Sequence, residues 1–267
     1  MANTGVSIVD TSEVPWEPHV LAGSTRKVLD RDEDTGGYVH LRQVPPGGAP
    51  AGRQLHLSVR ETFFWLHGDL PCWEYDSPLD LDGHLLVYRR GTFMDRWPLS
   101  IHGRRPTPES RNGAEFLIWT SGGAEFETDP EESIPVPFSP DPGDFGESFT
   151  SPTVIDTDSL PWSPHPRTAG LAWRSLDADT DDPRRHPISL VQIPPCWQAP
   201  ENLIPARRRC WVYGVQGSVP VRFDDTVVRI NEGVFARWGI GTSVKLAPEP
   251  TDVGCTLLCV GHALEIQ

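Results

Sequence analysis

The chain repeats one pattern of residues in its two halves. Residues 8–19 read IVDTSEVPWEPH and residues 154–165 read VIDTDSLPWSPH, with six of twelve positions identical and no gap. Four further pairs of similar segments follow in the same order: 41–48 with 190–197, 63–70 with 212–219, 91–102 with 233–243, and 116–122 with 256–262. Self-similarity of this kind is the sequence signature of repeated structural units, so we predict two copies of one domain.

An acidic, proline-rich stretch separates the two copies. Residues 127–151 read ETDPEESIPVPFSPDPGDFGESFTS and show little periodicity. Such a composition is typical of a connector. We therefore predict an N-terminal domain over residues 1–127, a linker over residues 128–150 and a C-terminal domain over residues 151–267.

Both copies are rich in short runs of β-branched, aromatic or alternating residues. These runs are 38–44, 54–59, 62–68, 84–91, 115–121, 189–193, 210–217, 226–230 and 256–261. The 28 prolines and 24 glycines punctuate the whole chain instead of filling one tail, which indicates many turns. No stretch of about ten residues shows a convincing helical period. The pattern predicts an all-β sandwich or barrel in each copy.

Charge and hydropathy exclude several classes of protein. The net charge is −14 and the basic clusters are short and scattered, which argues against nucleic-acid binding. No apolar run approaches the ~18 to 20 residues of a membrane span, and the first ten residues lack the features of a secretory signal. The five cysteines are odd in number and not spaced as a disulfide framework, which indicates reduced thiols. We expect a cytoplasmic protein.

The candidate metal ligands lie in the first copy. Gln54 and His56 are two apart on a predicted strand, so their side chains share a face, and Glu61 begins the next strand. A second stretch ends in His102, four residues after Pro98. We predict a metal site in this copy. The prediction depends on the combination of His56, a glutamate five residues later and the distant His102 in a repeated β domain.

These residues resemble the two motifs of the cupin superfamily. The matching residues are His56, Glu61 and Gly68 for the first motif, and Gly91, Pro98 and His102 for the second. The resemblance covers nearly the whole chain and implies two tandem cupin domains, each a jelly-roll β-barrel, related by internal duplication. The run from Arg89 to Gly113 is most similar to the branch that contains acetylacetone-cleaving dioxygenases and the cupin domains of zinc-binding anti-sigma factors.

The resemblance implies a ligand set of two histidines and one carboxylate. His56, Glu61 and His102 form this set, which leaves coordination positions open and suits Fe(II), Mn(II) or Ni(II). Zinc is an alternative, because three protein ligands and a water form a catalytic zinc site. We favour Fe(II). The first histidine of the family motif is Gln54 here, which is a weaker ligand or orients a bound water or a substrate.

The second copy lacks the same residues. At the aligned positions it carries Leu203, Pro205, Cys210 and Ser243, and an isolated cysteine holds a divalent ion poorly. We therefore predict that the second copy is structural. His19 and His165 recur in the repeated PW-x-PH element, and we interpret them as part of the scaffold.

Two classes of function remain. The first is a metal-dependent enzyme, for which the resemblance implies dioxygenase-type cleavage of a small diketone or enol-like substrate, with Glu61 and Gln54 as catalytic groups. The same site without redox chemistry suits an isomerase, cyclase or lyase. The second class is a non-catalytic sensor of a metal or small molecule. No DNA-binding or anti-sigma segment is visible, which favours the enzyme. The expected partner is a small-molecule substrate, and the chain is a monomer or a homodimer.

Overall fold

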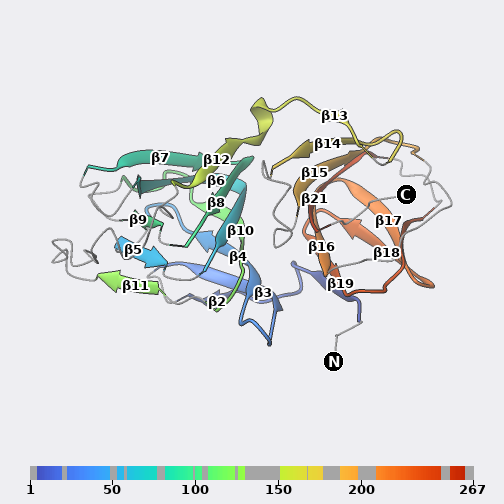
Figure 1. The fold of residues 1–267 in the computed structure, drawn as a ribbon, viewed down its shortest axis with the longest axis horizontal. Coiled ribbons are helices and arrows are strands. Elements are labelled where there is room, and N and C mark those ends of the chain that lie inside the picture. Colours follow the sequence, from blue (N-terminus) through green and yellow to red (C-terminus); the bar gives the residue numbers. More distant parts are fainter. Residues whose placement is uncertain are drawn as a thin grey trace. The chain divides into compact units, whose positions relative to one another are not determined.

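The structure is a computed structural model. It describes residues 5–19, 23–48, 53–56, 59–76, 82–98, 100–103, 108–123, 126–129, 151–166, 168–176, 187–197, 209–247 and 253–261. Apart from one 3-10 turn, Thr157–Ser159, the regular elements in these ranges are all strands (Figure 1). The predicted all-β class is therefore confirmed. Among the described residues, no helix is long and apolar enough to cross a membrane.

The chain forms two compact units. The N-terminal unit comprises Pro15–Asp158, and the C-terminal unit comprises Met1–Val14 together with Ser159–Gln267. The predicted domains follow one another along the chain, over residues 1–127 and 151–267. In the structure, each unit also takes a short segment from the far side of the connector.

The N-terminal unit contains one large sheet. Its strands are β2 (Glu17–Pro18), β3 (Thr25–Arg31), β4 (Tyr38–Val44), β5 (Arg53–His56), β6 (Glu61–Tyr75), β7 (His84–Arg89), β8 (Thr92–Arg96), β9 (Ile101–Gly103), β10 (Ala114–Thr120), β11 (Phe126–Asp129) and β12 (Thr153–Asp156). The path runs β11-β5-β9-β6-β10-β4-β3-β2, with β7 and β8 also on β6 and β12 on β8. The long strand β6 therefore pairs with four neighbours and organises the unit.

The C-terminal unit has two sheets built from corresponding strands. They are β1 (Ser7–Asp10), β13 (Ser163–Pro164), β14 (Ala172–Ser175), β15 (Ile188–Ile193), β16 (Cys210–Gln216), β17 (Ser218–Phe223), β18 (Thr226–Asn231), β19 (Val234–Trp238), β20 (Val244–Leu246) and β21 (Cys255–Val260). The seven-stranded sheet runs β1-β19-β16-β21-β15-β14-β13, and the other runs β18-β17-β20. All nine predicted runs overlap strands of the two units.

The first strand of each sequence repeat pairs within the unit made mainly by the other repeat. β1 pairs with β19, so that Asp10 lies opposite Val234, and β12 pairs with β8, so that Asp156 lies opposite Thr92. The hydrogen bonds after these strands also correspond. Thr11 N donates to Gly233 O, and Thr157 N donates to Gly91 O. The exchange is therefore reciprocal.

One glycine in each unit lets the chain turn from one set of neighbours to another. In β6 the residue is Gly68, with φ of +73°, and a Cβ there would lie 1.9 Å from Gly113 O. The corresponding residue between β16 and β17 is Gly217, with φ of +75°, where a Cβ would lie 2.0 Å from Gly254 O. Only glycine suits both the backbone conformation and the close approach.

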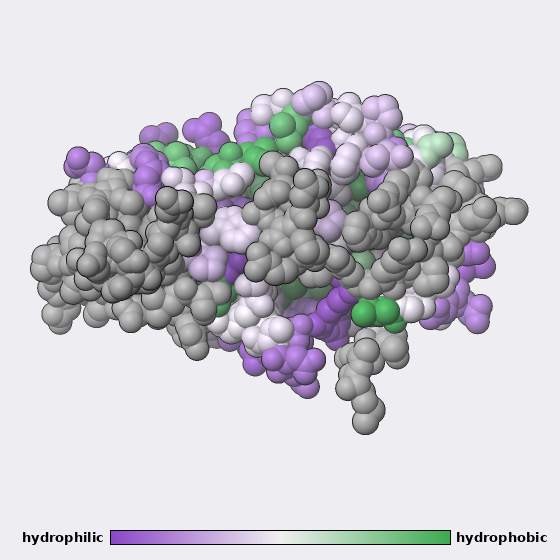
Figure 2. Space-filling model, viewed as in Figure 1, coloured by the Kyte–Doolittle hydropathy of each residue, from purple (hydrophilic) through white to green (hydrophobic). Residues whose placement is uncertain are grey.

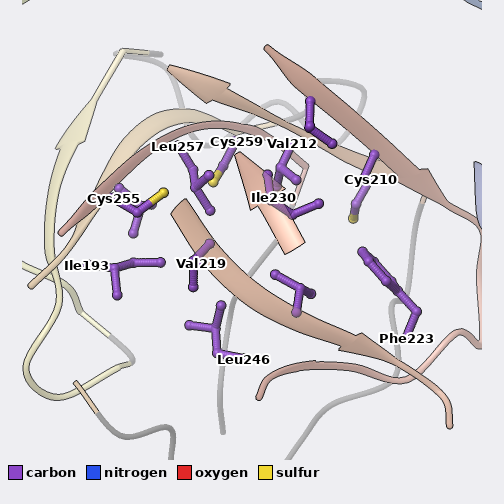
Figure 3. Close-up of a cluster of buried hydrophobic side chains, with 14 of the residues drawn as sticks. Ile193, Cys210, Val212, Val219, Phe223, Ile230, Leu246, Cys255, Leu257 and Cys259 are labelled. Carbon is purple, nitrogen blue, oxygen red and sulfur yellow. The ribbon is translucent and has the colours of Figure 1, made fainter. Parts of the chain in front are cut away.

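Each unit has its own buried core. In the C-terminal unit the core is almost entirely aliphatic, aromatic or thiol, as the cluster around Cys210, Ile230 and Cys259 shows (Figure 3). In the N-terminal unit the core contains Phe63, Trp65 and Phe116, and buried charged residues lie on the same face of the sheet. Figure 2 shows apolar surface over β7 and β12, the strands that carry exposed Leu85, Val87 and Val154.

Candidate functional site

Backbone register places three of the chemistry-bearing residues of the N-terminal unit in one row. The Cα of His102 on β9 lies opposite Gln54 on β5 and, across the other edge, opposite Glu74 on β6. His102 is buried, with 7% of its surface exposed. His56 lies two residues beyond Gln54 on β5, but the side chains of this strand fall outside the described part of the structure.

Glu61, the predicted carboxylate ligand, is the first residue of β6 and faces the interior. It shares a face with Phe63 and Trp65, which are core residues, and only 6% of its surface is exposed. Its backbone partner on β8 is Arg96, and Arg96 Nη1 lies 3.8 Å from Glu61 Oε2. Glu61 therefore begins a strand, as the sequence predicted, and its carboxylate lies inside the unit with a guanidinium beside it.

Arg96 is also bound to a second buried carboxylate. Its Nε donates to Glu74 Oε2 at 3.3 Å, and its Nη2 bonds to Glu74 Oε1. Tyr88 OH donates to the same Oε1 at 2.5 Å. The guanidinium lies over the ring of Phe63, with Cζ 5.0 Å from the centroid. Arg96 is therefore a cation held between two buried carboxylates.

This network perturbs the protonation of its members. Burial is the largest single influence and lowers the pKa of Arg96, but Glu74, Tyr88 and Cys72 together outweigh it and raise the pKa above its usual value. Burial and, next, the Glu74 carboxylate raise the pKa of Tyr88 well above its usual value. Burial and the same carboxylate raise the pKa of Cys72 to about 12. Arg96 therefore stays charged, while the phenol and the thiol stay neutral at physiological pH.

Sequence reasoning did not identify Glu74 and Arg96 as site residues. The available signal was that each is a charged residue two positions after an apolar core residue: Met94 precedes Arg96, and Cys72 precedes Glu74. The pairing of residues 22 positions apart depends on how β6, β8 and β9 assemble.

Two of the predicted metal ligands, Glu61 and His102, have side chains that the structure describes, and both are buried. Glu61 supplies a buried anionic oxygen and His102 a buried imidazole, which are ligand types that Fe(II), Mn(II) and Zn(II) accept. Arg96 contacts Glu61 as an outer partner of a ligating carboxylate would. Among the described side chains, no three histidine, cysteine or acidic groups meet as a metal cluster. A third donor would come from β5, where His56 and Gln54 lie.

The corresponding positions of the C-terminal unit are apolar. Cys210 lies opposite Trp238 on β19, as Glu61 lies opposite Arg96. Phe223 lies opposite Val244 on β20, as Glu74 lies opposite His102. The residue that takes the place of His102 is thus Val244, one position beyond the predicted Ser243, because the sequence alignment of this segment contained a gap. Leu203 and Pro205 lie outside the described residues.

Comparisons with known proteins concern the fold alone. No family model matches the chain, and no curated protein matches it in sequence. Among solved structures, the chain is similar to the protein Ylba from Escherichia coli, with a TM-score of 0.67 and 7% identity over 97% of this chain and 92% of that one. It is also similar to a protein from Nostoc punctiforme assigned provisionally as a dioxygenase, with a TM-score of 0.67 and 14% identity over 97% and 82%.

A third likeness is to oxalate decarboxylase from Bacillus subtilis, with a TM-score of 0.61 and 13% identity over 97% of this chain and 77% of that one. These likenesses extend over both units of the chain. They show the cupin fold and confirm the predicted fold class. The origin of the two units by duplication stays a prediction, which is supported by their matched strands and glycines.

Proposed function

We propose that the N-terminal unit is a metal-dependent enzyme of the cupin superfamily that acts on a small oxygenated substrate of the diketone or enol type, by dioxygenase-type oxidation. The observation that carries this proposal is the burial of Glu61 and His102 in a unit whose counterpart has Cys210 and Val244 at the same places. Buried charge is costly unless it is paired, so its retention on one of two similar scaffolds favours a functional role.

The proposed metal ligands are His56, Glu61 and His102, with Gln54 as a weak ligand or an orienting group. When bound, an Fe(II) ion would supply Lewis-acid stabilisation of an enolate and redox access to dioxygen, while Zn(II), which has no redox chemistry, would supply the first alone. Fe(II) is the ion we favour.

The other buried residues would prepare the site. Arg96 holds the Glu61 carboxylate from one side, and Glu74 with Tyr88 fixes the guanidinium. Phe63 and Trp65 form an apolar wall beside these groups, which limits water and strengthens each electrostatic contact.

The first experiment is metal analysis of the purified protein. We expect the wild type, loaded with Fe(II) and passed through a desalting column, to keep about one metal per chain, and the double variant His56→Ala/His102→Ala to keep almost none. His165→Ala, in the C-terminal unit, is the matched control and should load like the wild type. Equal metal contents in all three proteins would end the metal assignment.

The second experiment tests the reaction. Oxygen uptake by the iron-loaded protein is measured with a panel of β-diketones and enols. Uptake that depends on His102 supports the dioxygenase. Bound metal without uptake across the panel would exclude it and leave an isomerase, cyclase or lyase.

A binding protein that needs no metal is the second candidate. It is favoured by Arg96, which already places a positive charge 3.8 Å from Glu61. In that case the double histidine variant would bind the ligand as the wild type does.

A further inference from the structure

A second group of polar side chains lines β4 on the interior face of the N-terminal unit. Arg42 lies opposite Phe116 on β10, and His40 lies opposite Ile118. Phe116 and Ile118 belong to the buried core, so Arg42 and His40 share the face of that core. None of the predicted metal ligands lies on β4.

Arg42 is a partly buried cation whose hydrogen-bond partners are neutral. Its Nη2 lies 3.1 Å from Nδ1 of His19 and donates to Ser24 Oγ at 3.4 Å. Its Nε is buried and has no partner. Arg26, opposite Arg42 on β3, adds a second positive charge, but its own guanidinium is bound to Glu17 at 2.8 Å. Arg42 has no carboxylate within hydrogen-bond distance among the described residues.

His40 contributes a buried nitrogen without a partner. The residue is 1% exposed, its ring stacks on Tyr38 with centroids 4.8 Å apart, and its Nε2 makes no hydrogen bond. Burial and, next, the Arg42 charge lower the pKa of His40 to about 2, so the ring is neutral at physiological pH. Burial and then Arg42 also lower the pKa of His19, to about 4. The positive charge of the group therefore resides on its arginines.

Besides Arg42 Nε and His40 Nε2, a third buried nitrogen without a hydrogen-bond partner lies in the same row of the sheet as Arg42. Phe116 pairs with Arg42 on one side and with Trp65 on the other, and the buried Nε1 of Trp65 also lacks a partner. Buried polar groups are nearly always satisfied in native proteins, so three such nitrogens in adjacent rows indicate a polar group that the chain itself does not provide.

We infer that Arg42 and His40 form a subsite for one carboxylate group of the substrate. A guanidinium with a vacant N–H complements a carboxylate in both charge and geometry, and an imidazole N–H at Nε2 would donate a further bond. The inference rests on the proposed function, because it names the substrate class of the same interior. Within the diketone or enol type proposed above, the substrate then carries a carboxylate, as a diketo acid or an enol acid does.

The subsite lies within electrostatic reach of the proposed ligands. Burial lowers the pKa of Arg42, the Glu61 carboxylate offsets part of that decrease, and the net result is a pKa of about 10. A small substrate anchored at Arg42 by one end would thus extend its carbonyl groups towards the side of the interior that Glu61 occupies. In the C-terminal unit the residue aligned with Arg42 is Val191, which is buried in an apolar core.

The test uses two ligands that differ at one end. 2,4-Dioxopentanoate is acetylacetone with a terminal methyl replaced by a carboxylate. Dissociation constants for both are measured by calorimetry on the full-length wild type, Arg42→Met, Arg42→Lys and Arg90→Gln. Arg90 is exposed in a turn, so its replacement removes the same charge elsewhere in the unit.

We expect the wild type and Arg90→Gln to prefer the carboxylate ligand, and Arg42→Met to lose roughly 10- to 100-fold of that preference, the range of a charge-assisted hydrogen bond. Arg42→Lys should keep part of it. Equal affinities of the wild type for the two ligands would overturn the inference, even if Arg42→Met fails to fold. An unchanged preference in Arg42→Met would also overturn it. The same holds if inorganic phosphate displaces bound 2,4-dioxopentanoate at a lower concentration than acetate does, because the site would then not be selective for a carboxylate.

The same titrations after treatment with EDTA separate this inference from the proposed function. If 2,4-dioxopentanoate still binds in an Arg42-dependent way while metal loading has failed, the carboxylate subsite stands and the metal assignment falls. If metal loads as expected but Arg42 has no effect on the preference, the subsite falls and the metal assignment stands.

Discussion

The two units place different chemistry at the same positions of the same strands. In the N-terminal unit, Arg96 and Glu74 form a buried ion pair. In the C-terminal unit the corresponding residues are Trp238 and Phe223, whose rings pack with centroids 5.3 Å apart. Tyr88, which bonds to Glu74, is replaced by Ile230, because Tyr88 lies opposite Leu70 as Ile230 lies opposite Val219.

The comparison teaches that this scaffold does not need the charges in order to form. An ion pair that is taken out of water contributes little net stability, and apolar replacements of similar volume are often neutral or stabilising. The C-terminal unit is the apolar solution on nearly the same strands. The charges of the N-terminal unit are therefore better explained by a task that needs them, such as holding Glu61 beside a ligand.

The largest expected effect comes from breaking the ion pair on one side only. Arg96→Met leaves Glu74 buried and uncompensated, so we expect the free energy of unfolding to fall by about 3–5 kcal/mol in urea denaturation. The reference is the double variant Glu74→Phe/Arg96→Trp, which imports the ring pair of the C-terminal unit. We expect it to recover most of the loss. If the double variant were as unstable as the single one, the two interiors would not be interchangeable solutions.

The matched glycines test where the two units are alike. Gly68→Ala and Gly217→Ala both put a Cβ about 2 Å from a backbone oxygen at positive φ, so each should cost about 3 kcal/mol or more of unfolding free energy. Gly23→Ala is the control, since φ there is +77° but nothing lies within 4 Å, and about 1–2 kcal/mol is expected. A large loss at only one of the matched sites would show that the two bends differ.

The phenol of Tyr88 allows a smaller change in the same network. Tyr88→Phe removes a hydrogen bond to a charged group and should lower the free energy of unfolding by about 2 kcal/mol. Ile230→Val, a deletion of one methylene at the corresponding place, should cost about 1 kcal/mol. The two values come from the same urea denaturation assay. A Tyr88→Phe variant as stable as the wild type would mean that Arg96 alone satisfies Glu74.

The last effect is a difference in pH dependence, which vanishes at neutral pH and grows only as the pH falls. His40 is buried with its pKa lowered from 6.5 to about 2, so the unfolded chain binds one more proton than the folded chain between these values. Stability is therefore present above pH 6.5 and is lost as pH falls, by about 1.4 kcal/mol per pH unit for this one group. The aligned residue of the C-terminal unit is Ser189, which does not titrate in this range.

The measurement is the free energy of unfolding at pH 7, 6 and 5 for the wild type and His40→Phe. We expect the difference between the two proteins to shift in favour of the variant as the pH falls. A constant difference across the series would contradict a neutral, buried His40.

The strands could be predicted well from the sequence, because the alternation of apolar and polar residues along a strand involves only neighbouring positions. The predicted run 38–44 is β4 residue for residue, and Glu61 begins β6 as the sequence predicted for its strand. The role of Glu74 was beyond local reasoning, because the alternation of β6 is interrupted at Gly68 and its partner Arg96 is brought near by strand pairing. The assignment of Ser243 in place of Val244 failed for a related reason: the sequence alignment introduced a one-residue gap, and only the register of β17 and β20 shows that the two segments correspond without one. The metal ligands His56 and Gln54 stay predictions.

The reciprocal exchange of β1 and β12 makes the chain hard to divide. A cut anywhere between residues 130 and 150 would give one fragment that carries a strand of the C-terminal unit and another that carries a strand of the N-terminal unit. Neither fragment alone could complete its sheet. The pairs β1–β19 and β12–β8 would hold the two fragments together without a covalent link. A gene for this protein could therefore not be split at the connector into two self-sufficient halves, however similar those halves look in sequence.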